Sequence, residues 1–242
     1  MSFPFILPVA DSGISYAFSH SDFIGQSICI FLFCMSIVIW VIMLEKCITL
    51  NKAKKDTAGF SRLFLEKKNP LHLKGASERD RSPAARVYEA AVGRIDEFGI
   101  EVPGGGRRAL SDDELEVIKA TMSQEIEKQI SFMEKGMILL ATAVSASPFL
   151  GLFGTVWGIT IAFTNLAMAG RADIQTLAPG VAGALLTTVA GLVVAIPSLV
   201  GYNIVSTLLK RITVQLDNFA DEVAARFKIE QLDSIQAYRE RK

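Results

Sequence analysis

Long uncharged stretches alternate with charged ones along the chain, and this alternation predicts three membrane spans. Residues 23–44, 136–170 and 174–209 contain no Asp, Glu, Lys, Arg or His. A helix rises 1.5 Å per residue, so about 20 apolar residues cross a hydrocarbon core of about 30 Å. Each stretch is therefore long enough to span a bilayer. We expect the third span to begin near Pro179, because proline is tolerated in the first turn of a helix.

Amphipathic segments precede the second span and follow the third. Ser111 and Glu114 have the spacing of a capping box, which marks the start of a helix. The apolar positions at helical spacing are Leu115, Ile118, Met122, Ile126, Ile130 and Met133 in the first segment, and Ile212, Leu216, Phe219, Val223 and Phe227 in the second. We predict that the first amphipathic helix runs without a break into the second span. The third helix should continue past its span and pack on that amphipathic helix.

These elements indicate an all-α integral membrane protein with three transmembrane helices, whose long second and third helices extend into a cytoplasmic helical bundle. After the first span, we expect helices with breaks at Pro70, Gly75 and Pro83, and a plain inter-helix loop at 103–108. The predicted segments are 1–22 (N-terminal, periplasmic), 23–44 (span 1), 45–135 (cytoplasmic helical region), 136–168 (span 2), 169–178 (periplasmic loop), 179–209 (span 3) and 210–242 (cytoplasmic helix and tail).

The distribution of basic residues predicts the orientation. Lys46, Lys52, Lys54 and Lys55 follow the first span, and Lys210 and Arg211 follow the third. Basic residues that flank a span stay on the cytoplasmic side, so we expect the N-terminus outside and the C-terminus in the cytoplasm. The first 22 residues contain no Lys or Arg and therefore lack the basic region of a secretory signal. The first span should be an uncleaved anchor.

Composition narrows the possible functions. The 242 residues are 50% hydrophobic, and 25 Lys and Arg balance 25 Asp and Glu, so no global basic field favours nucleic acid. The cysteines (Cys29, Cys34, Cys47) and histidines (His20, His72) have no metal-ligand spacing. The glycines at 104–106 lack the phosphate-loop pattern. We predict a protein that is not an enzyme and that uses no cofactor, metal or nucleic acid.

Small residues and threonines share one face of each of the last two spans. Small residues permit the close backbone packing by which helices associate in lipid. The positions predicted for close packing are Pro148, Gly151, Gly154 and Gly158 in the second span, and Ala184, Gly191 and Ala195 in the third. We predict that Thr155 and Thr188, with Thr187 at the edge of the face, line a pore or proton pathway. Alternatively, this is only a packing surface, with Thr155 bonded back to its own helix.

The three spans contain no group that titrates near neutrality. Proton relays in membranes usually use buried Asp, Glu or His. Threonine hydroxyls can still hydrogen-bond to a carboxylate or to a file of water. If the protein conducts protons, we therefore expect the acid of the spans to come from a partner helix.

Two segments resemble a known family. SPFLGLFGTVWGI (147–159) and APGVAGALLTTVAGLVVAIPSLVGYN (178–203) are similar to the TolQ/ExbB branch of the MotA/TolQ/ExbB proton-channel family. The resemblance implies a bacterial inner-membrane homopentamer whose second and third spans line a pore around a dimer of single-span ExbD/TolR-type partners. The partner would supply a membrane aspartate, and a TolA/TonB-like protein would transmit force towards the outer membrane.

The resemblance also implies roles for individual residues. The pore threonines of the family correspond to Thr155 and Thr188, whereas Gly183 stands where TolQ and ExbB proteins usually have a glutamate. The first segment favours a TolQ role over an ExbB role. The alternatives are an ExbB-type energiser, a MotA-like stator, which typically has four spans, and a non-conducting scaffold suggested by Gly183.

Overall fold

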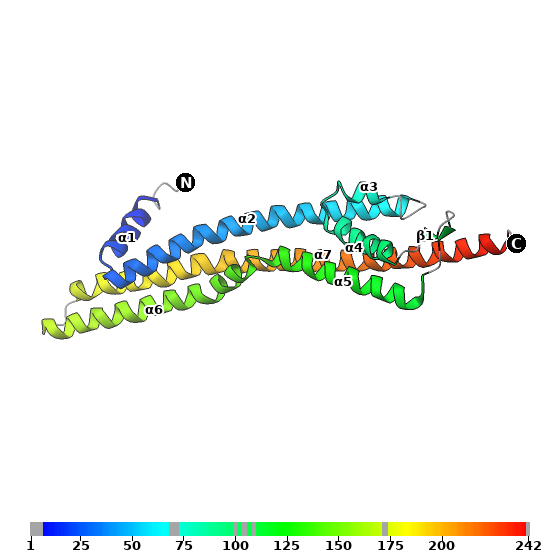
Figure 1. Cartoon of the computed structure of the whole chain (residues 1–242). Helices are drawn as coiled ribbons and strands as arrows, with labels where there is room; N and C mark the ends of the chain where they lie inside the picture. Colours follow the sequence, from blue (N-terminus) through cyan, green and yellow to red (C-terminus); the bar gives the residue numbers. More distant parts are fainter. Residues whose placement is uncertain are drawn as a thin grey trace. The chain divides into compact units, whose positions relative to one another are not determined.

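The computed structural model describes residues 7–67, 73–98, 101–102, 106–107, 110–170 and 174–240. Within these residues the chain is helical apart from one very short hairpin, which confirms the all-α prediction (Figure 1). The elements are α1 (Leu7–Ser19), α2 (Phe23–Glu66), α3 (Lys74–Ser77), α4 (Pro83–Glu97), β1 (Glu101–Val102), β2 (Gly106–Arg107), α5 (Asp112–Glu134), α6 (Met137–Ala169) and α7 (Ile174–Glu240).

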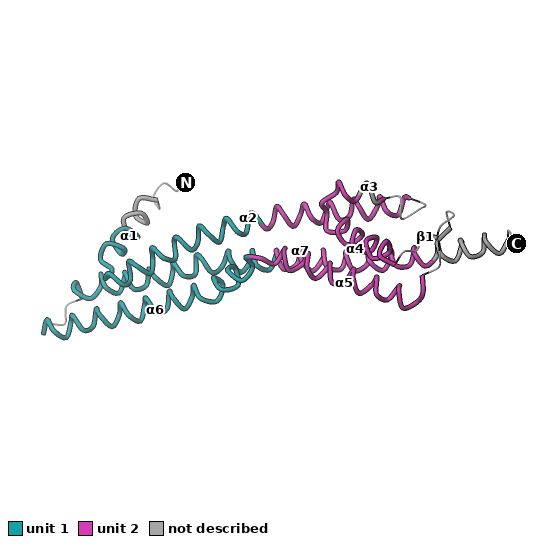
Figure 2. Tube along the Cα trace, in the orientation of Figure 1, with its two compact units in different colours: residues 1–45, 136–204 teal, residues 46–135, 205–242 magenta. Residues whose placement is uncertain are grey.

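The chain divides into two compact units (Figure 2). Unit 1 comprises residues 1–45 and 136–204, and unit 2 comprises residues 46–135 and 205–242. The long helices α2 and α7 each contribute to both units, whereas α6 lies in unit 1 and α3, α4 and α5 lie in unit 2.

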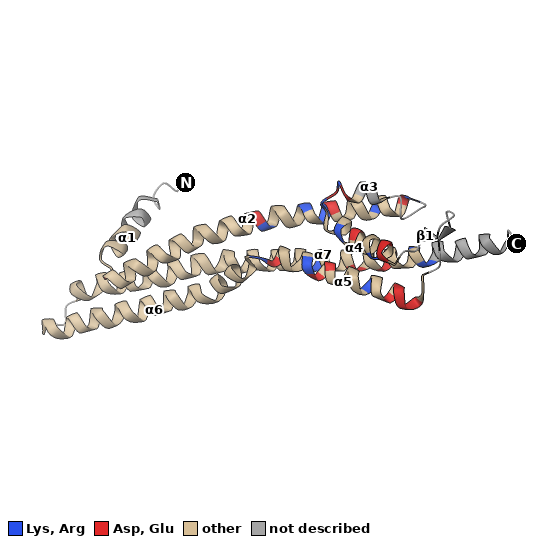
Figure 3. Cartoon of the chain, viewed as in Figure 1, with Lys and Arg blue, Asp and Glu red and all other residues tan. Residues whose placement is uncertain are grey.

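In the part of the chain that the structure describes, three helices are long and apolar enough to cross a membrane, α2, α6 and α7, and unit 1 holds α6 and the apolar parts of α2 and α7. Small apolar clusters hold them together, one around Leu32 and Val194 and another around Leu140 and Ala143. Many large apolar side chains face outward instead, among them Phe31, Phe33, Phe149, Phe153, Leu185, Val193 and Ile196. The described charges gather in unit 2 (Figure 3). An apolar exterior without charge suits contact with lipid or with further apolar helices.

Two glycines bound α6. Gly136 precedes the helix with φ 85°, and Gly170 ends it with φ 65°. Only glycine adopts this left-handed conformation without a steric cost. The prediction that the amphipathic helix runs unbroken into the second span is therefore wrong, since α5 ends at Glu134 and the chain turns at Lys135 and Gly136.

The third long helix begins earlier than predicted. We expected a start near Pro179, but α7 begins at Ile174 and contains Pro179 and Pro197 in its interior. A proline inside a helix removes one backbone hydrogen bond, and the first four N–H groups of a helix have no partner within it anyway. Pro179 is the sixth residue of α7, beyond those four, so the helix lacks one backbone hydrogen bond at this point.

Other local predictions have mixed outcomes. The break at Pro83 is confirmed, because Ser82 caps α4 and Pro83 is its first residue. Gly75 is not a break, since it lies in α3. Part of the loop predicted at 103–108 is paired instead, because Gly106 and Arg107 pair with Val102 and Glu101, while 103–105 and 108 lie outside the described residues. Helix α1 had no clear signal in its Ser- and Pro-containing sequence. Pro70 and His72 lie outside the described residues.

Unit 2 has an aromatic core. Phe60 and Phe64 of α2 each lie 5.4–5.9 Å, between ring centroids, from Tyr88 of α4 and Phe219 of α7. Edge-to-face pairs at such distances stabilise a core beyond the burial of their area. All five apolar positions predicted after the third span are buried, namely Ile212, Leu216, Phe219, Val223 and Phe227. The capping box of Ser111 and Glu114 is confirmed at the start of α5.

In unit 2, α7 contacts the C-terminal end of α2 and the N-terminal end of α5. The Arg226 guanidinium donates to the carbonyls of Phe64 (3.3 Å), Leu65 (2.9 Å) and Lys67 (2.7 Å), at the C-terminal end of α2. The last carbonyls of a helix lack partners within the helix and favour a positive charge. Lys228 forms an ion pair with Asp112 of α5 at 3.4 Å, which agrees with the predicted proximity of these two helices.

The Glu89 carboxyl makes the stability of unit 2 depend on pH. Burial raises the pKa of Glu89 above its ordinary value of 4.5, Arg86 opposes this, and Glu78 and Glu125 add to it. The folded state thus favours the protonated form. This contribution to stability is complete below the unfolded pKa and is lost as pH rises through the folded pKa.

We therefore expect Glu89→Gln to be more stable than the wild type at pH 7, with a smaller difference at pH 4. The gain at pH 7 should be less than about 1 kcal/mol, because the side chain is partly exposed. Thermal unfolding at a series of pH values measures this difference. Arg86→Gln is the control, since it removes the 3.5 Å ion pair but keeps the carboxyl. An unchanged pH dependence in Glu89→Gln would contradict the assignment.

Candidate functional site: hydroxyls between α6 and α7

The backbones of α6 and α7 approach closely at glycines. A Cβ added to Gly151 would lie 2.8 Å from the Thr187 carbonyl oxygen, and one added to Gly154 would lie 2.6 Å from Thr187 Oγ1. At Gly158 an added Cβ would lie 2.8 Å from the Ala184 Cβ. Distances this short do not occur between real Cβ atoms and their neighbours, so the three glycines are required for this packing. We call this contact the α6–α7 seam.

Three threonine hydroxyls lie in the seam. Thr155 Oγ1 is 2.9 Å from the Ala184 carbonyl oxygen, and it contacts Thr188 Oγ1 at hydrogen-bond distance. Thr187 Oγ1 is 2.7 Å from the Ala184 carbonyl oxygen and 3.0 Å from that of Gly151. Thr188 Oγ1 is 3.2 Å from the Gly151 carbonyl oxygen. Each hydroxyl proton therefore has at least two acceptors within reach, so it can rotate from one to another.

The three threonines differ in how far their side chains are buried. Thr187 is fully buried, whereas Thr155 and Thr188 are half-buried and reach the surface of the chain. Thr187 had been placed at the edge of the small face, yet its hydroxyl lies at the centre of the seam. Direct lining of a pore stays a prediction for Thr155 and Thr188, while Thr187 can contribute only from the interior.

Both interpretations of Thr155 from the sequence, a hydroxyl bonded to its own helix and a hydroxyl available to other groups, fit the distances. Its hydroxyl is 3.2 Å from the Gly151 carbonyl oxygen of its own helix, and also within reach of α7. The remaining predicted packing positions are buried in α7 at Ala184, Gly191 and Ala195, and half-buried in α6 at Pro148. An added Cβ at Gly191 would lie 2.5 Å from the Ser147 carbonyl oxygen, which extends the seam by a further turn.

Sequence reasoning missed a second contact at one end of the seam. Trp157 Nε1 of α6 donates to Asp22 Oδ2 at 2.6 Å, and the other oxygen of this carboxylate accepts from the Gly25 backbone N–H at 3.1 Å. Asp22 thus caps the start of α2 and joins it to α6. The Asp22–Gly25 spacing is a capping signal, but nothing in the sequence pairs it with Trp157, 135 residues away.

Gly183 of α7 lies next to the turn that contains Asp22. A Cβ added there would collide with Ser21 Oγ and would lie 3.0 Å from the Ala17 carbonyl oxygen. The space next to position 183 is therefore filled by the end of α1 and the turn that follows it. A glutamate at this position could not be accommodated without moving α1 or the turn.

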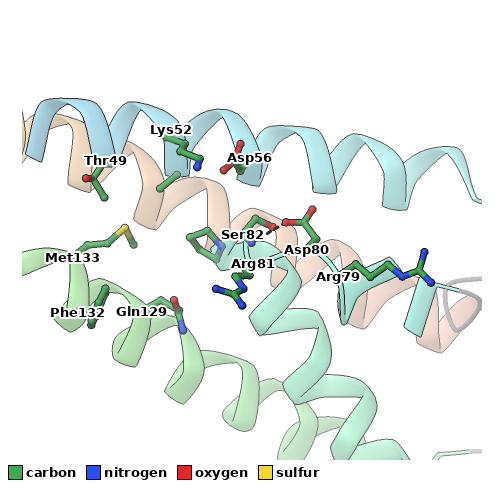
Figure 4. Close-up of a pocket in the computed structure, with 12 residues that line it drawn as sticks. Thr49, Lys52, Asp56, Arg79, Asp80, Arg81, Ser82, Gln129, Phe132 and Met133 are labelled. Carbon is green, nitrogen blue, oxygen red and sulfur yellow. Dashed lines mark hydrogen bonds between the residues drawn. The ribbon is translucent and has the colours of Figure 1, made fainter. Parts of the chain in front are cut away.

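Unit 2 contains a cavity of its own, of about 680 Å³ (Figure 4). Thr49, Lys52 and Asp56 of α2 line one side, and Gln129, Phe132 and Met133 of α5 line another. The Asp80 carboxylate at its edge accepts from the Ser82 backbone N–H at 2.8 Å, which orders the start of α4. Among the residues that the structure describes, no group of three His, Cys, Asp or Glu side chains is placed to hold a metal.

The helices and the seam define a membrane protein with three apolar candidate spans, two of which meet through glycines and threonines. Residues 81–218 match the MotA/TolQ/ExbB proton channel family. This match covers more than half of the chain, and the protein belongs to that family.

Relatives of two names are similar to most of the chain. The Tol-Pal system protein TolQ of Haemophilus influenzae is 32% identical over 212 residues, covering 85% of this chain and 89% of the relative. The biopolymer transport protein ExbB of Neisseria meningitidis serogroup A is 31% identical over 225 residues, covering 91% and 99%. TolQ of Pseudomonas aeruginosa is 29% identical over 210 residues, covering 86% and 89%. The sequence identities to the relatives named TolQ and ExbB are too similar to favour one name over the other.

Proposed function

We propose that this protein is a TolQ-like subunit of a motor driven by the proton motive force. In this proposal five copies form a pore lined by α6 and α7, and a dimer of single-span ExbD/TolR-type partners occupies it. The partner's membrane acid exchanges protons beside Thr155 and Thr188. The complex then energises a TolA/TonB-like protein for outer-membrane maintenance or transport.

The observation that carries the proposal is the hydroxyl cluster of the α6–α7 seam. Thr155 and Thr188 reach the surface of an otherwise apolar pair of helices and hydrogen-bond to each other. Hydroxyls on an apolar surface at membrane depth can hydrogen-bond to a polar group of a partner helix. Because each hydroxyl has alternative acceptors, it can donate to a carboxylate or accept from a carboxylic acid without leaving its place.

The proposed orientation places the protein in the bacterial inner membrane with the N-terminus in the periplasm. Lys46 and Lys52 follow the apolar part of α2, and Lys210 and Arg211 follow that of α7. Retention of such residues on the cytoplasmic side supports a cytoplasmic unit 2 and C-terminus. Each proton that crosses yields about 2.3 kcal/mol per 100 mV, so several are needed for sizeable mechanical work.

An ExbB-type energiser of TonB-dependent uptake is the second candidate. The Neisseria meningitidis relative named ExbB is matched over 99% of its length, at an identity within one percentage point of the Haemophilus influenzae TolQ. The two roles share the same mechanism in this chain and differ in the protein that receives the force.

Native mass spectrometry of the protein extracted gently from its own membranes tests the proposed assembly. We expect five copies together with two copies of a single-span subunit that carries an aspartate in its span. The same preparation in vesicles should conduct protons. A stable homo-oligomer without such a subunit, which fails to conduct, would instead favour the non-conducting scaffold.

A further inference from the structure

A cavity of about 290 Å³ lies in unit 1, beside the start of α2 and between α6 and α7. Its lining comes from three parts of the chain: the turn before and into α2, the second half of α6, and the first turns of α7. His20 and Asn165 line it and are exposed, so the cavity opens to the outside of the chain at that end. A water molecule occupies about 30 Å³ in the liquid, so this space can hold several.

The inner end of the cavity reaches the hydroxyl cluster. Gly154 and Ala184 line it, and both are part of the seam. The Ala184 carbonyl oxygen is the acceptor for Thr155 and Thr187, at 2.9 and 2.7 Å. The cavity thus reaches residues that are in contact with the threonine hydroxyls.

Asp22 and His20 are the ionisable side chains of the cavity wall. The α6 and α7 walls contribute only glycine, alanine, isoleucine, proline, asparagine and threonine. The His20 ring stacks on Tyr16, and its Nδ1 lies 2.9 Å from the Tyr16 carbonyl oxygen, so the ring is held on α1. The half-buried Asp22 carboxylate is held from two sides, by the Trp157 indole and the Gly25 amide.

We propose that Asp22 is the proton-exchanging group at the mouth of this cavity and feeds the hydroxyl cluster of the α6–α7 seam. This inference rests on the proposed proton-driven function. Asp22 takes a proton from hydronium at the mouth, which leaves water and a neutral carboxylic acid. It then gives the proton to a water molecule on the cavity side and returns to the carboxylate.

The geometry at Gly183 fits this assignment. Position 183 also lines the cavity, but Ser21 and Ala17 fill the space in which a side chain would lie. The residue next to Ser21 is Asp22. The same cavity wall therefore has no acidic side chain on α7 and has one, Asp22, on the turn between α1 and α2.

The alternative is that Asp22 only caps α2 and anchors Trp157, and Asp22→Asn compared with Trp157→Phe separates the two roles. Asparagine can still cap α2 through its one amide oxygen, but its NH2 group cannot accept from the Trp157 indole, so Asp22→Asn loses that hydrogen bond together with the proton-accepting carboxylate. Trp157→Phe is the matched control, because it removes the indole hydrogen bond and keeps the carboxylate. Asp22→Glu keeps a titratable group at the mouth.

The assay is proton flux into vesicles that contain the complete complex, reported by an internal pH-sensitive dye under an imposed gradient. We expect Asp22→Asn to reduce the flux about tenfold, less than the 100-fold or more typical of a positioned proton-transfer group, because cavity water offers a parallel route. Its flux should also lose the wild-type dependence on external pH. Trp157→Phe should retain that pH dependence, and Asp22→Glu should restore most of the flux.

The outcomes distinguish the inference from the proposed function. If the wild-type complex conducts and Asp22→Asn conducts equally, with the same pH dependence, the role of Asp22 is overturned while the motor stands. If Trp157→Phe and Asp22→Asn lose flux alike, without a change in pH dependence, Asp22 is only an anchor and the inference is equally wrong. If the wild-type complex does not conduct, the proposed function itself fails.

Discussion

Replacing Thr155 with valine is expected to slow proton-driven function about 5- to 150-fold, while the protein still assembles. Valine keeps the shape of threonine and removes the hydroxyl that lies between the Ala184 carbonyl oxygen and Thr188. The loss of a hydrogen bond to a charged or transferring group costs about 1–3 kcal/mol, which gives this range in rate. The measurement is proton flux in vesicles, with copy number read by native mass spectrometry.

Thr160→Val is the matched control for this variant. Thr160 lies on the same helix, is exposed, and donates only to the Val156 carbonyl of its own helix, at 2.7 Å. It should leave the flux unchanged. Thr155→Ser, which restores the hydroxyl, should recover most of the activity. Wild-type flux in Thr155→Val would remove the hydroxyl cluster from the pathway and leave the seam as packing surface alone.

Replacing Gly154 with alanine is expected to destabilise unit 1 by about 1–3 kcal/mol, the usual cost of an added carbon in a well-packed contact. The new Cβ would lie 2.6 Å from Thr187 Oγ1 and 2.7 Å from Thr187 Cβ. Because Thr187 is fully buried, it has no free space to move into. The helices must separate, so we expect reduced thermal stability in detergent and weakened contacts among the three hydroxyls.

Gly93→Ala provides a control of opposite sign. Gly93 lies in α4, is exposed, and an added Cβ would meet nothing within 4 Å. Alanine is favoured over glycine in a helix interior by about 0.5–1 kcal/mol, so this variant should be slightly more stable than the wild type. A Gly154→Ala protein as stable as Gly93→Ala would show that the seam is looser than its geometry indicates.

The long uncharged stretches were sufficient to predict the three helices and the face on which two of them meet. The contacts of Gly158 with Ala184 and of Gly151 with Gly191 were predictable because helical period and residue size are both local properties of the sequence. The five apolar residues at spacings of three or four after the third span were likewise sufficient to predict the core positions of α7 in unit 2.

Helix ends and long-range polar contacts were less predictable. Gly136 stands where the charged residues end and the second span begins, and its left-handed φ of 85° belongs to the turn between α5 and α6, which the pattern of apolar residues did not specify. The hydrogen bond from Trp157 to Asp22 joins residues that approach only after three helices have packed. The burial of Thr187 rather than Thr188 depends on the rotation of α7 about its axis, and a helical wheel leaves that rotation uncertain by about one residue.

The seam is built almost entirely from residues that have no rotamers to change. Glycine and alanine lose no side-chain entropy when they are packed, and threonine has a single stiff χ1 angle. When a charge passes such a wall, only hydroxyl hydrogens need to turn. In the proposed motor, the α6–α7 pair would therefore offer a passing acid a surface with a low reorganisation energy, which needs no repacking between turnovers.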